Sequence, residues 1–232
     1  MKHPPADRLI RGAAAMGLEV TPATAGVLLA LWDRMCVEPQ NLTAIDDVQE
    51  AVDRHLLDSL AGLGSPHIRG PVADIGSGGG FPGLVLAIAR PDLEVTLVES
   101  ERRKARWLED ASAALPNVRV VADRTEHLAR RARASFRTVT ARAVAPLPVT
   151  LELAAPLLAP DGCAVVWSTE LPPDALAAAG VAATALSLTP LEPLPVHPFT
   201  DARRVVRAYR RAGEVPGRYP RRPGRAAARP IA

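Results

Sequence analysis

The segment "VADIGSGGGFPGLVLAIARPDLEVTLVES" (residues 72–100) decides the fold. It contains a short apolar run, a glycine-rich turn, an apolar stretch of helical length and a second apolar run that ends at Glu99. A strand, a loop, a helix and a strand in this order form the repeating unit of a parallel sheet. The glycines let the backbone turn sharply and approach a ligand closely, because no Cβ intervenes. We therefore expect a ligand-binding loop at the carboxyl end of the first strand, where open α/β sheets bind their ligands.

The same alternation of strand and helix continues along the chain. Strands are predicted at 72–76, 94–99, 118–123, 136–141, 162–168, 183–189 and 203–209, and helices at 82–90, 101–114, 146–158 and 173–179. The run "RRVVRAYRR" (203–211) alternates weakly and is predicted to be an edge strand. The pattern indicates a Rossmann-like, doubly wound α/β sheet with an antiparallel edge strand.

Helical patterns precede the first strand. Residues 6–18 and 22–38 have apolar positions at helical spacing, and Asp46 or Asp47 can cap a third helix. We predict an N-terminal helical extension over residues 1–65, a catalytic domain over 66–210 and a basic, Pro- and Arg-rich tail over 211–232.

The net charge of +3 hides an uneven distribution. Residues 203–232 hold ten Arg and one Glu, about +9, so the remaining 202 residues carry 18 basic and 24 acidic side chains, about −6. A basic strip on an acidic body favours contact with phosphates. The alternative is a solvated tail in a chain that uses 26 Arg and only two Lys.

Other features concern the cellular location. No apolar run reaches the roughly 20 residues that a membrane span needs, and the N-terminus has no apolar signal segment. Cys36 and Cys163 are far apart, which favours reduced thiols. We expect a cytoplasmic protein that does not contact membranes and, without a large apolar seam, a monomer.

Two kinds of cofactor fit the glycine loop. Gly78, Gly80 and Gly83 match the G-x-G-x-x-G spacing of dinucleotide sites, whereas D-x-G-x-G-x-G, counted from the strand, is favoured by S-adenosylmethionine enzymes. A carboxylate at the end of the second strand can bind ribose hydroxyls in either case. We interpret the loop as a site for S-adenosylmethionine, and a purely structural turn is the alternative. The residues expected to contact the cofactor are Asp74, Gly76, Gly78, Gly80, Glu99 and Asp123.

Four segments resemble one family. "NLTAIDDVQEAVDRHLLDSL" (41–60), "DIGSGGGFPG" (74–83), "ARAVAPL" (141–147) and "YPRRPG" (219–224) are similar to the bacterial family of small-subunit ribosomal RNA guanine-N7 methyltransferases, RsmG or GidB. The resemblance implies a class I methyltransferase fold with S-adenosylmethionine as cofactor and S-adenosylhomocysteine as product. It also implies 16S ribosomal RNA, or the small ribosomal subunit, as the partner.

The resemblance carries roles to matching positions. It implies that Phe81 of the loop lines the cofactor together with Thr125 and Glu126, and that Arg142 faces both cofactor and substrate. Arg124, beside the expected adenine site, is a further candidate for the cofactor. Further family positions near the cleft are Arg54, His55, Asp58 and Ser59. The expected RNA-binding residues are Arg103, Lys104, Arg218, Arg221, Arg222 and Arg225.

Guanine N7 carries a free lone pair, so its methylation needs alignment more than a general base. We take Arg142 and His55 as candidate catalytic residues, with Arg142 or Arg124 able to bind guanine O6. His55 could instead be a helix histidine bonded to a neighbouring carboxylate such as Asp58 or to backbone. The histidines lack metal-ligand spacing, and no metal is expected.

The chain differs from the family after the fifth strand, where "VWSTE" (166–170) contains no Lys. This leaves an alternative function, a ring-nitrogen methyltransferase of a small heterocycle on the same scaffold. A non-catalytic RNA-binding relative is a further alternative.

Overall fold

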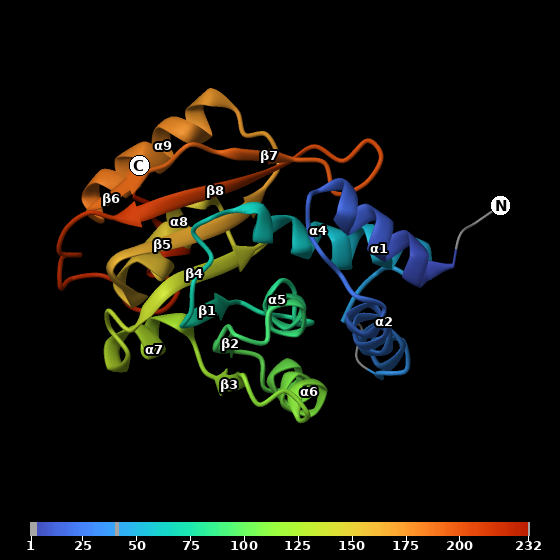
Figure 1. The fold of residues 1–232 in the computed structure, drawn as a ribbon. Helices are drawn as coiled ribbons and strands as arrows, with labels where there is room; N and C mark the ends of the chain where they lie inside the picture. The colour runs from blue at the N-terminus through green and yellow to red at the C-terminus, as the bar shows by residue number, and fades with distance from the viewer. Residues whose placement is uncertain (1–3, 40–41, 232) are drawn as a thin grey trace.

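A single eight-stranded sheet organises the protein (Figure 1). The computed structural model describes residues 4–39 and 42–231. The strand order is β3-β2-β1-β4-β5-β8-β6, and β7 also pairs with β8. The strands are β1 (Val72–Ile75), β2 (Val95–Glu99), β3 (Val118–Ala122), β4 (Phe136–Arg142), β5 (Leu158–Ser168), β6 (Leu188–Pro190), β7 (Leu194–Val196) and β8 (Arg204–Arg211).

The strand order reverses at β1. The chain leaves β1 toward β2 and β3 on one side, then returns to place β4 on the other side. These strands and β5 are parallel, whereas β8 runs antiparallel to β5. A ligand crevice is expected at the carboxyl ends of β1 and β4, where the order switches.

Helices precede the sheet and alternate with its strands. Before β1 come α1 (Pro5–Ala15), α2 (Pro22–Cys36), α3 (Val48–Ala51), the π-helix η1 (Val52–Leu57), α4 (Asp58–Leu60) and the 3-10 helix η2 (Ala61–Gly64). After β1 come α5 (Gly83–Ala89), α6 (Arg102–Ser112), α7 (Thr125–Arg131), α8 (Leu147–Ala154), η3 (Ala155–Leu157), α9 (Pro173–Ala185) and α10 (Arg225–Ala228). The Asp47 carboxylate caps α3 by accepting from the amides of Gln49 and Glu50 at 2.9 and 3.0 Å, as the sequence predicts.

The sheet is buried on both faces. One apolar cluster joins α5, α6 and the N-terminal helices to one face, and a second joins α7, α8 and α9 to the other. Figure 1 shows α1, α2 and α4 at the right beside α5, with α9 at the top left. The N-terminal helices therefore extend one helical layer of the sandwich.

The prediction that the strand at 203–211 lies at the edge of the sheet is wrong. It lies between β5 and the short strands β6 and β7, and its positions 205–209 are buried. Its weak alternation in the sequence arises because it is covered on both faces.

The prediction of a strand at 183–189 is also wrong. The helix α9 continues to Ala185, and only Leu188–Pro190 forms a strand. Ala179, Ala182 and Ala183 are buried at helical spacing, and the high helix propensity of alanine carries the helix past Gly180.

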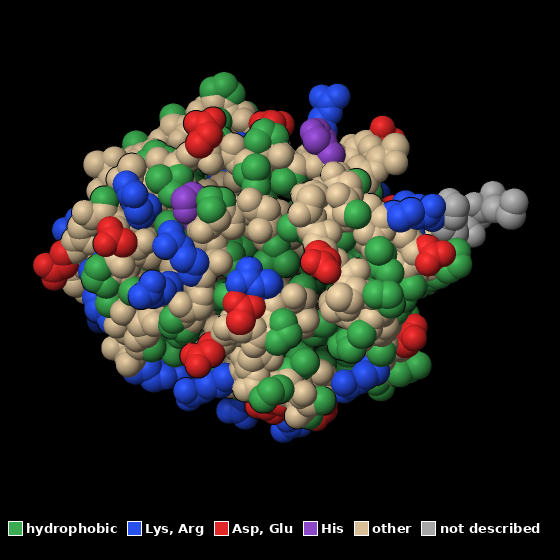
Figure 2. Space-filling model, viewed as in Figure 1, with side chains coloured by type: hydrophobic (Ala, Val, Ile, Leu, Met, Phe, Trp, Pro, Cys, Tyr) green, Lys and Arg blue, Asp and Glu red, His purple; other side chains and the backbone are tan. Residues whose placement is uncertain are grey.

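The Arg-rich tail packs on the body of the protein. Val215 and Tyr219 are buried, and the Arg133 guanidinium donates to the carbonyls of both. Figure 2 shows that many Lys and Arg side chains gather along the left and lower parts of one face. No helix within residues 4–39 and 42–231 is long and apolar enough to cross a membrane.

Candidate active site

The glycine loop leaves β1 in a conformation that requires glycine. Gly76, Gly78 and Gly80 have φ of +65°, +55° and +105°. A Cβ on Gly76 would lie 2.9 Å from a methyl carbon of Val144, and one on Gly80 would lie 2.4 Å from Leu84. The amide of Gly76 donates to the carbonyl of Val98, so the loop stays fixed against β2. The expectation of a sharp glycine turn after the first strand is confirmed, and the structure adds that these glycines are left-handed.

Asp74 supports this loop from within the core. Its side chain is fully buried, and its carboxylate accepts from the Thr140 hydroxyl at 2.7 Å and from the Gly83 amide at 3.2 Å. Burial raises the pKa of Asp74 to about 6, although the bond from Thr140 counteracts the shift. Asp74 therefore positions the loop and the start of α5.

Glu99, at the end of β2, faces the same crevice. One carboxylate oxygen accepts from the Gly78 amide at 2.9 Å, and the other accepts from the Glu101 amide at 2.7 Å. A carboxylate offers about four acceptor sites, so each oxygen keeps capacity for a further donor. The residue fixes the glycine loop and can still accept bonds from a ligand.

The residues expected at the adenine end lie after β3. Hydrogen bonds, first from Arg131 and then from His127, lower the pKa of Asp123 to about 2, and the Arg124 amide donates to the same carboxylate. Thr125 is buried at the start of α7. The neighbouring Glu126 is also buried and accepts from the Gly224 amide at 3.2 Å, so its carboxylate already has a partner in the tail.

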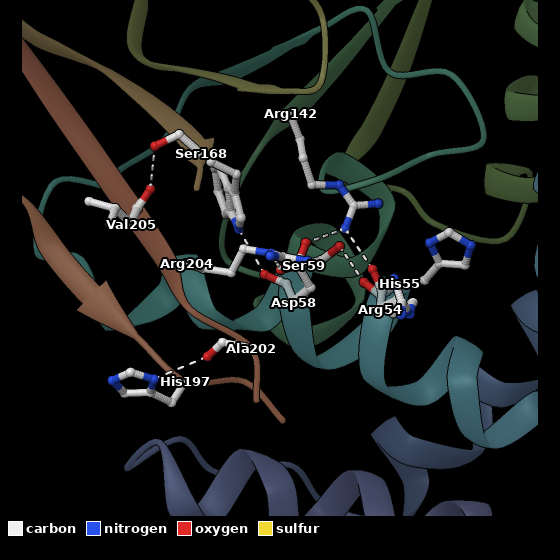
Figure 3. A network of polar contacts seen from close by, with 11 residues as sticks. Arg54, His55, Asp58, Ser59, Arg142, Ser168, His197, Ala202, Arg204 and Val205 are labelled. Carbon is white, nitrogen blue, oxygen red and sulfur yellow. Dashed lines mark hydrogen bonds and ion pairs between the residues drawn. The ribbon is translucent and has the colours of Figure 1, made fainter. Parts of the chain in front are cut away.

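Arg142, at the end of β4, is held by a carboxylate of the N-terminal extension. Its guanidinium donates to Asp58 at 2.8 Å, and Arg204 of β8 donates to the other oxygen of that carboxylate at 2.9 Å. The Asp58 side chain is only 7% exposed. Figure 3 shows the two arginines converging on Asp58 from different strands.

The side chains of Asp58, Arg142 and Arg204 border a cleft of about 390 Å³. Its other lining residues are Arg54, His55, Ala143, Trp167, Ser168 and Thr169. Within the described residues, the Nη2 and Nε atoms of Arg142 have no hydrogen-bond partner, so donors remain for a ligand. The cleft therefore combines a fixed cationic donor with a partly apolar wall.

Phe81 connects this cleft to the glycine loop. Its ring stacks on His55 with centroids 4.5 Å apart and planes 8° from parallel, and the Arg142 guanidinium lies 5.2 Å from its centroid. The segments that resemble the family at 41–60, 74–83 and 141–147 thus meet at one place.

His55 is bonded to a hydroxyl and not to Asp58, and its catalytic role stays a prediction. Its Nε2 lies 2.7 Å from the Thr43 hydroxyl, and its Nδ1 is buried without a partner among the described residues. Burial, and then the charge of Arg142, lowers its pKa to about 4. A neutral ring stacked on Phe81 is suited to positioning that side chain. Its π-helix η1 is a form that is common at functional sites.

The residues expected to bind RNA differ in how exposed they are. Arg103, Arg218, Arg222 and Arg225 are exposed, whereas Lys104 pairs with Glu101 at 2.9 Å. Arg221 differs most from the expectation, since it forms a bidentate pair with the buried Glu152. Arg221 therefore anchors the tail.

The sequence interpretation missed three members of the site. Arg204 binds Asp58, the Trp167 indole donates to the Asp58 carbonyl at 2.8 Å, and Thr43 binds His55. Arg204 and Trp167 are more than 100 residues from Asp58 in the chain. Thr43 lies only 12 residues from His55, in a segment that carries the family resemblance, but no periodic pattern identifies the pair.

The sequence is similar to a known family along most of its length. The family model described as "rRNA small subunit methyltransferase G" (GidB) matches residues 30–197. A protein named ribosomal RNA small subunit methyltransferase G from Deinococcus deserti is 38% identical over 94% of this chain and 93% of its own length. One of the same name from Deinococcus radiodurans is 39% identical over 95% of this chain and 91% of its own length.

The fold was compared with solved structures. The 16S rRNA (adenine(1408)-N(1))-methyltransferase from Catenulisporales acidiphilia, with cosubstrate SAM, superposes with a TM-score of 0.51. The match covers 62% of this chain and 85% of that chain at 16% identity. At this identity the likeness demonstrates a shared methyltransferase fold, as the sequence predicts.

Proposed function

The chain belongs to the family of rRNA small subunit methyltransferase G, and we propose that it transfers a methyl group to N7 of a guanine in 16S ribosomal RNA. Family membership makes it an S-adenosylmethionine-dependent methyltransferase of small-subunit ribosomal RNA. The proposal goes beyond family membership, because it assigns the cofactor and the guanine to particular residues.

One observation carries the proposal. The glycine loop ends in Phe81, whose ring contacts both His55 and the guanidinium that Asp58 holds. The candidate cofactor loop and the arginine-lined cleft are therefore neighbours at the point where the strand order reverses. Methyl transfer needs this arrangement, because donor and acceptor must lie within contact distance and in line.

The residues present fit the cofactor. The left-handed glycines leave the loop backbone uncovered, and Glu99 has acceptor capacity for a pair of hydroxyl groups. We assign the loop 76–81 to the amino-acid part of the cofactor, Glu99 to its ribose, and Asp123 with 124–126 to its adenine. When bound, S-adenosylmethionine supplies a methyl group that its sulfonium makes electrophilic.

The chain's own task is then to hold the guanine. The edge of guanine that carries N7 also carries O6, and an arginine can donate to either acceptor. We assign the unused donors of Arg142 to O6, which would leave N7 directed toward the methyl group. Asp58 fixes the plane of this guanidinium, since it also binds Arg204 on its other oxygen.

No proton has to be removed from N7 before it attacks, so a general base is unnecessary. The lowered pKa of His55 agrees with this, because a histidine with a pKa of about 4 stays neutral at pH 7. We assign His55 to positioning Phe81 against Arg142. Contacts with the RNA backbone are assigned to the exposed Arg103, Arg218, Arg222 and Arg225.

The small-heterocycle alternative loses support from the comparisons, since each relative described above is named as a methyltransferase of ribosomal RNA. A direct test is incubation of the protein and radiolabelled S-adenosylmethionine with small ribosomal subunits, protein-free 16S RNA or small-molecule extracts. Label should enter RNA at one guanine, and reduction followed by aniline cleavage should cut the RNA there, as it does at 7-methylguanosine. Label that enters only the small-molecule fraction would support the alternative. Calorimetry with S-adenosylhomocysteine tests for a non-catalytic relative, which would not bind it.

A further inference from the structure

A second basic cavity lies at the other end of the strands. It has a volume of about 370 Å³ and is lined by His67, Arg69, Arg137 and the segment 159–163. Arg137 is near the start of β4, whereas Arg142 is at its end. Five residues of strand separate them by about 17 Å, at roughly 3.3 Å per residue. The cavity is therefore distinct from the methyl-transfer cleft and lies toward the opposite edge of the sheet.

The walls of this cavity are fixed in place. Thr138 of β4 is fully buried, and its hydroxyl accepts from the Arg69 amide at 2.9 Å and lies 2.8 Å from the Arg69 carbonyl. The amide of Arg137 donates to the Pro71 carbonyl at 2.9 Å. These bonds clamp the segment before β1 onto β4, so the two arginines project from rigid backbone.

The third wall is an irregularity in β5. Phe136 pairs with Leu158, but Thr138 pairs with Cys163, so residues 159–162 loop out of the ladder. Asp161 has a left-handed φ of 59°, and a Cβ on Gly162 would lie 3.0 Å from the Arg137 carbonyl. Bulges of this kind often redirect side chains near sites of function.

Positively charged side chains lie in and near the cavity. Arg69 and Arg137 are exposed, and within the described residues their guanidinium groups have no hydrogen bond or ion pair. Arg210 of β8 pairs in register with Cys163 of the third wall. Burial, and then the charges of Arg69 and Arg210, lowers the pKa of His67. Asp161 is the one carboxylate among the residues that line the cavity.

Figure 2 shows several Lys and Arg side chains on the left of this face. Like charges held close together repel each other, so the cluster costs folding stability unless an anion compensates for it. A phosphate offers several acceptor oxygens to arginine donors, which matches this excess of cations.

We propose that the cavity lined by His67, Arg69 and Arg137, with Arg210 of β8 nearby, binds a backbone phosphate of the substrate RNA, as a second anchoring site remote from the methylated base. This inference rests on the proposed function, because it takes ribosomal RNA as the partner. A contact about 17 Å along the sheet lets the protein hold a neighbouring part of a folded RNA and fix the orientation of the target guanine.

The test compares two double variants of the full-length chain. Arg69→Gln/Arg137→Gln removes two cations of the cavity, and Arg11→Gln/Arg119→Gln removes two exposed arginines elsewhere, so both variants lose the same charge. Affinity for protein-free 16S RNA is measured from low to high salt with S-adenosylhomocysteine present. We expect roughly ten-fold weaker binding for the cavity variant, with the salt slope reduced by about 0.7–0.9 for each phosphate that the variant no longer neutralises. Its affinity for S-adenosylhomocysteine and its thermal midpoint should not fall.

Three outcomes would overturn the inference. These are an unchanged salt slope in the cavity variant, an equal loss of affinity in the control variant, or a lower thermal midpoint that assigns the arginines to folding. Failure of the proposed function would look different, since the unmodified protein would then neither bind nor methylate 16S RNA.

Discussion

Replacing Asp58 by Asn should both destabilise the protein and impair methyl transfer. The carboxylate accepts charged hydrogen bonds from Arg142 and Arg204 at 2.8 and 2.9 Å, and the three side chains are 7%, 15% and 27% exposed. Asn retains the shape and one acceptor oxygen but presents an amide to the second arginine. A hydrogen bond to a charged group contributes about 1.5–3 kcal/mol.

We therefore expect a loss of about 2–4 kcal/mol of unfolding free energy, since partial exposure of Arg204 weakens its share. For a chain of this length, each kcal/mol lowers the thermal midpoint by about 2–4 °C, so a decrease of roughly 4–16 °C should be measured by calorimetry. Methyl transfer to RNA should fall at least ten-fold at a temperature where the variant is folded, because Arg142 loses its anchor.

A matched control is Asp92→Asn, which removes a carboxylate from the exposed pair with Arg90. An exposed pair contributes at most about 1 kcal/mol, so this variant should keep its thermal midpoint and its activity. If Asp58→Asn were as stable and as active as Asp92→Asn, the reasoning about the arginine pair would be refuted. If it were unstable but fully active at low temperature, Asp58 would serve folding alone.

Three further predictions concern the loop, its buried acid and the tail. Gly76→Ala should lower the free energy of unfolding by about 1–2 kcal/mol, because alanine resists the left-handed conformation, and calorimetry should show no binding of S-adenosylhomocysteine. The control Gly26→Ala, where a Cβ on α2 meets open space, should be neutral or stabilising. Equal behaviour of the two variants would contradict the role of the loop. The pKa of Asp74 is raised to about 6, so the folded state keeps a proton that the unfolded state releases near pH 4. The free energy of unfolding, measured by denaturant titration, should therefore fall as the pH rises from about 4 to 6. Asp74→Asn should abolish that slope, and an unchanged slope would assign it to another group. Glu152→Gln should leave Arg221 without its buried partner and cost about 3 kcal/mol, with the tail becoming sensitive to protease first; a tail as resistant as in the unmodified protein would exclude this anchor.

Much of the architecture could be predicted because local chemistry encodes it. The strands from β1 to β5 are apolar runs that glycine, proline or capping residues separate, and their order alternates with helices. The glycine loop was predictable for the same reason, since its conformation excludes other residues. Local reasoning failed at 183–189, where a run of alanines and threonines is compatible with either state, and packing of α9 on the sheet decides for the helix.

The site could be predicted only in part. The positions of Glu99 and Arg142 follow from strand ends, which meet at one edge of a parallel sheet. The pair of Asp58 and Arg204, by contrast, joins residues 146 apart through an antiparallel strand whose neighbours the sequence does not specify. Periodicity reveals which face of an element is buried, but it does not identify the partner of a polar side chain on a distant element.

The predicted boundary at residue 65 separates helices from sheet, yet it does not separate the parts of the site. Asp58 of the N-terminal extension holds Arg142 of β4 and Arg204 of β8. The backbone of Gly62 packs so closely on the Trp167 ring that a Cβ there would lie 1.9 Å from it. Without the extension, the two arginines would lose their shared carboxylate and Phe81 would lose the His55 ring. The helices before the sheet therefore complete the cleft at Arg142. A fragment of residues 66–232 should bind S-adenosylhomocysteine only weakly in calorimetry and should transfer no methyl group to RNA.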